Sequence, residues 1–331
     1  MSDHRPGLSL FEVMEMFPDE QTAHAWFARQ RWGTDEADRF CPRCGCTETR
    51  RSKRRPYYFC TGCKKRFSVR TGTVMEASRL PVRKWAVATF LIVAGIKGVS
   101  STRLARDLDI TQKSAWFLLH RLRDALEGLG ERREPFAGTV EVDEKYVGGR
   151  TKNMSNARRR AMRAAGETWQ DHKSIVVGAR NRETGAVQAQ VVEQADRPTL
   201  HGFVADNVAP GATVYTDEAP AYRGLPYPHE TVNHGVREFV RDQVVSTNGI
   251  ESFWALFQRG YQGTHHWMSP KHLPRYRGGV RGAVVAAETE HRRADARGCG
   301  RDGRAAADVR AVDGPSEAVA VAPTVEGILL T

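Results

Sequence analysis

Two Cys-x-x-Cys pairs, separated by fifteen residues, constrain the fold of this chain more than any other feature of its sequence. The pairs are Cys41 with Cys44 and Cys60 with Cys63. This spacing lets two tight turns close on one tetrahedral Zn²⁺ ion, and four thiolates leave no position open for water or substrate. The sequence therefore predicts a structural zinc ribbon over residues 37–75. We expect Gly45 and Gly62 to permit the backbone conformations of its two turns. Its expected strands are Tyr57–Phe59 and Arg66–Val69.

The remaining cysteines leave this prediction unchanged. Cys46 is either a bystander or a replacement for Cys44 in a less regular site, and Cys299 is isolated. Because five of the six cysteines lie close together, metal ligation is favoured over disulfides in a reducing compartment, and buried free cysteines are the alternative. The sequence has neither an apolar run long enough to span a membrane nor a secretory signal at its start, so we expect a cytoplasmic protein.

The charge of the chain favours a polyanionic partner. The formal net charge is +11 and the isoelectric point is near 9.6. A charge of this size favours nucleic acid binding but does not establish it. Cations lie beside aromatic residues on the expected ribbon, an arrangement that suits DNA, although zinc ribbons also mediate protein contacts. The candidate DNA contacts of the ribbon are Lys64, Lys65 and Arg66.

Helical patterns flank the ribbon. Residues 1–36 predict a helical lead-in, which Pro18 breaks into two short helices. Residues 80–130 predict a further helical region, whose last two helices are short, are capped by Ser101 and Thr111 and meet at a tight turn. This pattern is typical of a helix-turn-helix, and an ordinary helical hairpin is the alternative. The outward-facing side chains that could read a major groove are Gln112, Lys113, Ser114 and Arg121.

From Gly138 the pattern becomes that of an α/β domain with a mixed sheet. It predicts three strands, a helix, a fourth strand and a last helix that Ser246 or Thr247 caps. The expected ranges are Thr139–Val147, Ser174–Arg180, Ala186–Glu193, Pro198–Val208 and Ala212–Thr216. A basic insertion separates the first two strands, and it either follows a DNA backbone or is a solvated surface. Its candidate DNA contacts are Arg158, Arg159 and Arg160.

Acidic side chains occupy positions in this domain where they can converge. Asp143 lies within the first strand, on the face of Glu141 and Lys145, and Asp217 follows the fourth strand. If these strands are neighbours, the two carboxylates meet, and Asn248 or Glu251 of the last helix can add a third ligand. Oxygen ligands of this kind hold Mg²⁺ or Mn²⁺, and a pair of such ions supports phosphoryl transfer.

The chain resembles DDE transposases of bacterial insertion sequences, in particular the zinc-ribbon-bearing fifteen-ninety-five group. The resemblance covers about Met16 to Tyr276, and the segments that carry it are CPRCG with FCTGCKKRFSVRTGT, EVDEKYVGG, VYTDEAPAY and STNGIESFWALFQRGYQGTHHWMSPKHLPRY. It implies an RNase H-like catalytic domain over residues 136–276, preceded by the zinc ribbon and the helical DNA-binding region. It also implies cleavage at element ends and transfer of 3′ hydroxyls into target DNA.

Carried over to this sequence, the resemblance assigns Asp143 and Asp217 as the first two acidic ligands. Members of the group use Asn or Glu as the third, so Asn248 and Glu251 both remain candidates. Relatives often place a Lys one helical step after the Glu, where this chain has Gln258. This difference leaves Arg259 or Lys271 to contact phosphate. Three histidines in matching stretches are candidates for contacting DNA or organising the site: His234, His265 and His266.

The chain departs from the group after Tyr276. Residues 277–331 are rich in Ala, Gly, Val and Arg, and they contain no Phe, Tyr, Trp or Lys, so we expect disorder there. We hypothesise that a reading-frame shift replaced the end of the catalytic domain, a loss that could leave the protein inactive. A family-like helix encoded in another frame of the gene would support this hypothesis, and its absence would contradict it.

Three functions remain compatible with the sequence. The first is a transposase that binds element ends as a homo-oligomer and cuts and joins DNA with bound Mg²⁺. The second is a zinc-ribbon DNA-binding protein whose RNase H-like domain is a non-catalytic scaffold. A nuclease without strand transfer is the third. In each case the partner is double-stranded DNA, and the protein is nucleoid-associated when bound.

Overall fold

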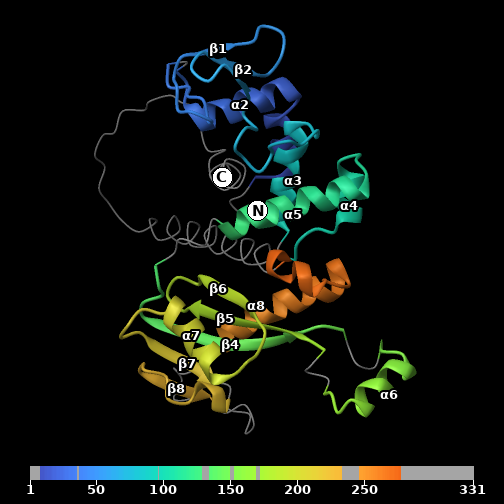
Figure 1. The fold of residues 1–331 in the computed structure, drawn as a ribbon, viewed down its shortest axis with the longest axis vertical. Helices are drawn as coiled ribbons and strands as arrows, with labels where there is room; N and C mark the ends of the chain where they lie inside the picture. The colour runs from blue at the N-terminus through green and yellow to red at the C-terminus, as the bar shows by residue number, and fades with distance from the viewer. Residues whose placement is uncertain are drawn as a thin grey trace, which may run out of the picture. The chain divides into compact units, whose positions relative to one another are not determined.

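A computed structural model describes residues 8–35, 37–95, 97–128, 134–149, 153–168, 172–232 and 246–276. The described residues form two compact units, one within residues 8–128 and one chiefly within residues 134–276. Each is described by itself (Figure 1). Among the described helices none has the length and apolar character needed to cross a membrane. His234 lies outside the described residues. So does the whole segment 277–331, for which we predicted disorder.

The first unit begins with the two short helices that the sequence predicts, α1 (Leu10–Met16) and α2 (Glu20–Trp32). The side chain of Asp19 accepts a hydrogen bond from the Thr22 amide and caps α2. The next long helix, α3 (Val82–Ala94), follows Pro81, and most of its side chains are buried. The three helices share one apolar core with the ribbon.

The ribbon has three antiparallel strands, β1 (Thr49–Arg51), β2 (Tyr58–Cys60) and β3 (Arg66–Phe67). We predicted β2 and β3 but not β1, because its three residues show no apolar alternation and are held only by pairing with β2. The buried Trp32 at the end of α2 lies edge-on to the ring of Tyr58, with centroids 5.3 Å apart, and to the ring of Phe67, with centroids 5.8 Å apart.

The last two helices of this unit are α4 (Ser101–Asp107) and α5 (Gln112–Gly128). Ser100, rather than the predicted Ser101, caps α4, since its hydroxyl accepts from the Arg103 amide. The Thr111 hydroxyl accepts from the Ser114 amide at 3.2 Å, so the predicted cap of α5 is confirmed. Between the helices Asp109 adopts a left-handed conformation with φ of 48°, which makes the turn tight.

The second unit is built on one mixed sheet of five strands in the order β6-β5-β4-β7-β8 (Figure 1). The strands are β4 (Thr139–Val147), β5 (Ser174–Asn181), β6 (Val187–Val192), β7 (Thr213–Asp217) and β8 (His229–Val232). The first three are antiparallel, whereas β4 and β7, and β7 and β8, are parallel. The first and fourth strands expected from the sequence, β4 and β7, are therefore neighbours, which is the condition on which the two carboxylates can meet. We missed β8, a four-residue edge strand without a distinctive pattern.

Helices cover both faces of this sheet. The helix α7 (Arg197–Asn207) packs Leu200 and Phe203 against Val140 and Val142 on one face. The helix α8 (Asn248–Arg259) packs its aromatic side chains on the other face, in a second core. With this strand order and these two layers of helices, the predicted α/β, RNase H-like fold class is confirmed.

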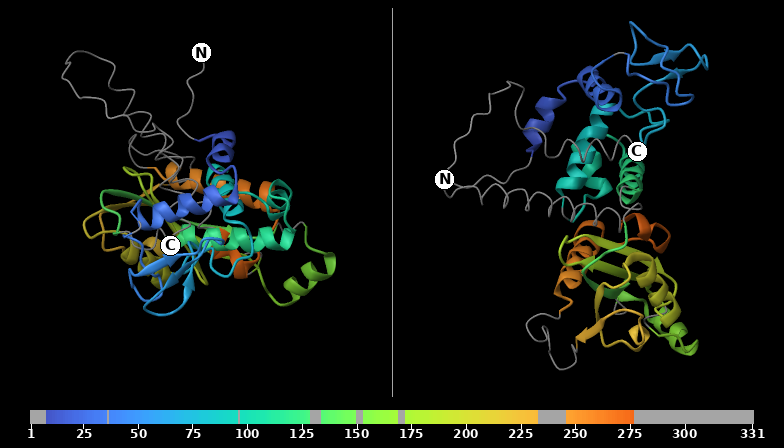
Figure 2. Two further views of the ribbon diagram at one scale, coloured as in Figure 1. Left: turned by 90° about the horizontal axis from the view of Figure 1, so that it is seen from above. Right: turned by 90° about the vertical axis from the view of Figure 1, so that its left-hand side faces the viewer.

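Shorter elements complete the unit. The basic insertion contains a helix, α6 (Asn156–Ala164), which buries none of its residues and stands away from the sheet (Figures 1 and 2). We did not predict it as a separate helix. The helix α8 continues into a π-helical turn, η4 (Gly260–His265), and short 3₁₀ turns occur at η2 (Pro220–Tyr222) and η5 (Pro270–His272).

Glu20 connects α2 to the start of α3, and its loss should destabilise the first unit. The carboxylate accepts from the amides of Val82 at 2.7 Å and Arg83 at 3.0 Å and lies 3.2 Å from both His24 Nε2 and Arg70 Nη2. Burial raises the pKa of Glu20, but the hydrogen bonds from His24 and the two amides outweigh it and lower the pKa to about 2. The charged form is therefore favoured by folding.

We expect Glu20→Gln to lower the free energy of unfolding at pH 7 by about 1 kcal/mol, since the side chain is more than a third exposed. The stabilisation is present above the ordinary pKa of 4.5 and is lost as pH falls towards 2, so the difference from wild type should vanish over that range. Denaturant unfolding at pH 7, 4 and 2 measures it. The exposed Glu15→Gln is the control, and an equal loss in both variants would contradict the prediction.

Candidate functional site

The four predicted cysteine ligands come together in the ribbon. One sulfur atom from each of Cys41, Cys44, Cys60 and Cys63 lies within 4.8 Å of the other three. The Sγ atoms of Cys41 and Cys63 are 3.8 Å apart, and those of Cys44 and Cys60 are 3.5 Å apart. Four thiolates at these separations fit the tetrahedral coordination of Zn²⁺, so the ribbon has the donor set of a structural zinc site. Cys46 stands outside the cluster, as a bystander.

Backbone geometry explains how the two turns of the ribbon close. The carbonyl of Cys41 accepts from the Gly45 amide at 2.8 Å, and Gly45 has a φ of 75°, as the sequence suggested. In the second turn Lys64 takes the equivalent left-handed conformation, with a φ of 57°. Gly62 is needed for its small size rather than for a positive φ, because a Cβ there would lie 3.1 Å from the sulfur of Cys46.

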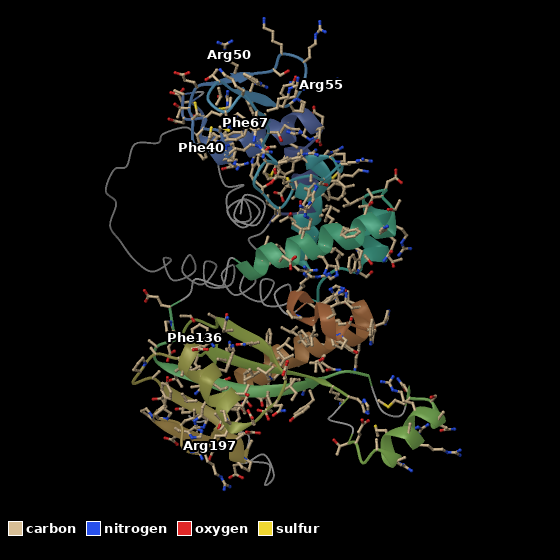
Figure 3. The ribbon with its side chains drawn as sticks, viewed as in Figure 1. Phe40, Arg50, Arg55, Phe67, Phe136 and Arg197 are labelled. Atoms are coloured by element: carbon tan, nitrogen blue, oxygen red, sulfur yellow. The ribbon has the colours of Figure 1, made fainter. Side chains whose placement is uncertain are left out.

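The ribbon presents a basic surface. Lys64, Lys65 and Arg66 are all exposed, and Arg66 lies over the ring of Tyr57 at 5.0 Å. Arg50 and Arg55 lie at the outer surface of the same ribbon (Figure 3). Since guanidinium groups over aromatic rings are preorganised for phosphate and base contacts, this surface suits nucleic acid.

The start of α5 presents two of the side chains that we predicted to read a major groove. Gln112 and Lys113 are exposed, and the side-chain amide of Gln112 donates to the Ser101 hydroxyl at 2.8 Å, which ties α5 to α4. The expectation that Arg121 also faces outward is wrong. Its guanidinium donates to the Glu76 carbonyl at 2.8 Å and lies 5.9 Å over Trp85, because the long side chain folds back onto the core.

The parallel pairing of β4 with β7 brings Asp143 and Asp217 to the same level of the sheet. Thr139 pairs with Thr213, Val140 with Val214 and Glu141 with Tyr215, and the same offset of 74 residues sets Asp143 beside Asp217. Asp217 ends β7, where its carboxylate accepts from the Ala219 amide at 3.0 Å. The two acids that lie far apart in sequence are thus neighbours in the sheet.

Burial and repulsion from neighbouring acids dominate the electrostatics of Asp143. Desolvation, with additional repulsion from Glu144 and Asp217, raises the pKa of Asp143 to about 7. Burial also raises the pKa of Glu144, against a hydrogen bond of 2.7 Å from the buried hydroxyl of Tyr222. Sequence reasoning did not include Glu144, although it directly follows Asp143. Such a concentration of negative charge favours a bound cation.

The helix α8 lies on the same face of the sheet as Asp143. Gly178, the β5 partner of Asp143, has no room for a Cβ because Trp254 and Ile250 of α8 cover it. Asn248 and Glu251 lie in the first turn of this helix and are exposed. Among the described residues, the four cysteines form the one cluster of three or more His, Cys, Asp or Glu side chains that fits a metal ion.

The remaining predicted contacts are dispersed over the surface of the second unit. Arg158 and Arg160 are exposed on α6, whereas Arg159 is half-buried and donates to the Asn156 side chain at 2.9 Å. Arg259 at the end of α8 and Lys271 in η5 are exposed. The ring of His265 lies against Tyr276, with centroids 4.8 Å apart. The ring of His266 is within hydrogen-bond distance of the Gln262 carbonyl, at 3.0 Å.

Two family models match this chain. Residues 135–280 match the ISXO2-like transposase domain, and residues 18–66 match the transposase zinc-ribbon domain. The chain is also similar to an uncharacterized protein in transposable element ISH50 of Halobacterium salinarum. The identity is 28% over 268 residues, which cover 78% of this chain and 86% of the relative. The matched ranges contain the cysteine cluster and the strands and helix that carry the candidate carboxylates.

Replacing one cysteine of the cluster should remove the metal and unfold the ribbon. We expect Cys60→Ser to lower the zinc content of the purified chain from about one equivalent to almost none, because binding and folding of such a site are coupled. Cys46→Ser is the matched control and should retain the metal. Elemental analysis with thermal unfolding measures both, and retention of zinc by Cys60→Ser would contradict the assignment.

Removing the charge of Asp143 should stabilise the protein in the absence of Mg²⁺. With a folded pKa of about 7 against an ordinary value of 3.8, folding favours the protonated acid, and stability falls as pH rises through this window. At pH 8 Asp143→Asn should therefore raise the melting temperature by about 2–4 °C, corresponding to about 1 kcal/mol, with little effect at pH 4.

Thermal unfolding without chelator, so that the zinc stays bound, measures this effect. Glu183→Gln, on the turn after β5, is the control for removing an acid without removing a carboxylate from the pair. A lower melting temperature of Asp143→Asn at pH 8 would show that the carboxylates do not repel one another.

Proposed function

We propose, from the premise that this chain belongs to the ISXO2-like transposases with a zinc ribbon, that it binds the ends of its insertion sequence and catalyses Mg²⁺-dependent strand cleavage and strand transfer. The observation that carries the proposal is the parallel pairing of β4 with β7 within the matched domain, whose register, continued two residues beyond Glu141, brings Asp143 level with Asp217. Burial and the repulsion of Glu144 and Asp217 disfavour the charge of Asp143, and a bound cation would offset both effects.

In this proposal three side chains hold the catalytic metal. Asp143 and Asp217 contribute carboxylate oxygens, and either the amide oxygen of Asn248 or the carboxylate of Glu251 adds the third ligand. When bound, a pair of Mg²⁺ ions activates the attacking oxygen and stabilises the leaving oxygen of a phosphodiester. The protein orients the acids: the Glu144 amide donates to Asp143 at 2.9 Å and the Ala219 amide to Asp217, which limits how their carboxylates turn.

The basic surfaces of the two units would bind the DNA. On the first unit these are the ribbon residues Lys64, Lys65 and Arg66 and the start of α5, with Gln112 and Lys113, in a helix-turn-helix-like region. On the second unit they are Arg158, Arg159 and Arg160 of α6 together with Arg259 and Lys271. Exposed cations bind the phosphate backbone without sequence preference, so sequence discrimination falls to polar groups such as Gln112. Pairing of two element ends would require a homo-oligomer.

A non-catalytic DNA-binding protein is the second candidate. It is supported by one observation, namely that the described residues of the second unit include no cluster of three His, Cys, Asp or Glu side chains that fits a metal ion. In that case the sheet would serve only as a scaffold. Mg²⁺-dependent cleavage by the wild-type protein would exclude this candidate.

The decisive experiment incubates the full-length protein with a labelled duplex that carries one end of the element, with and without Mg²⁺. We expect cleavage at the element end with Mg²⁺ only, and a loss of at least about 1000-fold in Asp143→Asn with unchanged binding of the duplex. Joining of a pre-cleaved end to a second duplex separates a transposase from a nuclease. Binding without cleavage by the wild type would contradict the catalytic proposal.

The same assay identifies the third ligand. Asn248→Ala and Glu251→Ala are compared under equal conditions, and the ligand variant should lose cleavage to the same extent as Asp143→Asn. The other variant should retain most of its rate. Mn²⁺, which accepts less ideal ligands, is included as a second metal for both variants.

A further inference from the structure

Glu141 is the most deeply buried acid on the strand that carries Asp143. The residue is 1% exposed, and it lies two positions before Asp143, on the same face of β4. Its Oε2 accepts from the backbone amide of Ile250 at 2.7 Å, and its Oε1 lies 3.1 Å from Nε of Arg182. A buried carboxylate is tolerated only with such partners, and here the partners belong to α8 and to the turn that follows β5.

The start of α8 depends on this carboxylate. The N-cap residue, Thr247, provides no side-chain hydrogen bond to the first turn, although the first amides of a helix have no partners within the helix. The amide of Ile250 donates instead to Glu141, whose negative charge also suits the positive end of the helix. Arg182 adds a hydrogen bond of 3.0 Å to the Ser246 hydroxyl, just before the helix.

The packing around Gly249 leaves no room for a larger residue. A Cβ at this position would lie 2.5 Å from Oε2 of Glu141 and would overlap the guanidinium of Arg180. Because Glu141 is buried and paired, it cannot move aside at low cost. The glycine therefore permits the close approach of the helix to the acid, and it directly follows one candidate metal ligand, Asn248.

We propose that Glu141 is a positioning residue: by capping α8 from β4 it fixes Asn248 and Glu251 relative to Asp143. The inference rests on the proposed function and deepens it, since it names the contact that sets the geometry of the metal ligands. Glu141 itself is satisfied by the Ile250 amide and Arg182, so it supports the ligands rather than binding the metal.

Two variants and one control test the proposal in the full-length protein. Glu141→Gln removes the charge at the helix start, and Gly249→Ala displaces the intact carboxylate. The control, Glu183→Gln, alters an exposed glutamate that also accepts from a backbone amide, that of Thr139 at 2.9 Å, but at the start of β4. All three are compared for amide exchange of a peptide spanning residues 246–254 and for the Mg²⁺ dependence of cleavage.

We expect amide exchange at the start of α8 to become at least about tenfold faster in both variants. The Mg²⁺ concentration for half-maximal cleavage should rise about 10–100-fold, while affinity for the element end and zinc content stay at wild-type values. A loss of fold alone would not shift the metal dependence in this way. The control should behave as wild type in both measurements.

Wild-type exchange at the start of α8, or wild-type Mg²⁺ dependence in Glu141→Gln, would overturn the proposal. If Glu141→Gln does not fold, Gly249→Ala provides the same comparison with the carboxylate retained. If the wild-type protein does not cleave DNA at all, the proposed function fails. The exchange measurement then still decides whether Glu141 holds α8.

Discussion

The parallel pairing of β4 with β7 is the constraint on which the second unit depends. Its register, continued two residues beyond Glu141, brings Asp143 level with Asp217 at the end of β7, and burial and repulsion raise the pKa of Asp143. The strands must be well packed on both faces to hold two such acids, and the cores under α7 and α8 provide that packing. The same register that brings these acids together also brings their charges together, which is unfavourable for folding while the charges are not neutralised.

The first unit is held together in a different way. A ribbon of three very short strands has little apolar surface of its own, so it relies on the cysteine cluster and on Trp32 of α2, which packs against Tyr58 and Phe67. Because the cysteine cluster and the aromatic contacts hold the ribbon together, the charged side chains of the ribbon can face outward. Arg121 is an exception, because its guanidinium donates a hydrogen bond to the Glu76 carbonyl within the unit.

Glu141 and Glu144 show how supporting residues escape a search of the sequence. Both flank Asp143 in the same motif, yet their roles depend on Ile250 and Tyr222, which are 109 and 78 positions further along the chain. Alternation along β4 correctly placed Glu141 on the face of Asp143. It gave no reason to expect a buried carboxylate there, because its partner in α8 is a backbone amide, which carries no signature in the sequence.

The sequence by itself determined the cysteine cluster, the strand β4, the cap of α5 and the family resemblance, because these depend on local spacing, periodicity and turn chemistry. Only the tertiary structure decided that β4 lies beside β7, that β1 and β8 are strands, and that Arg121 turns inward. These features come from pairing and packing between distant segments. A side chain or a short strand takes its place there from what it contacts, and those contacts are set by the assembled fold rather than by its neighbours in sequence.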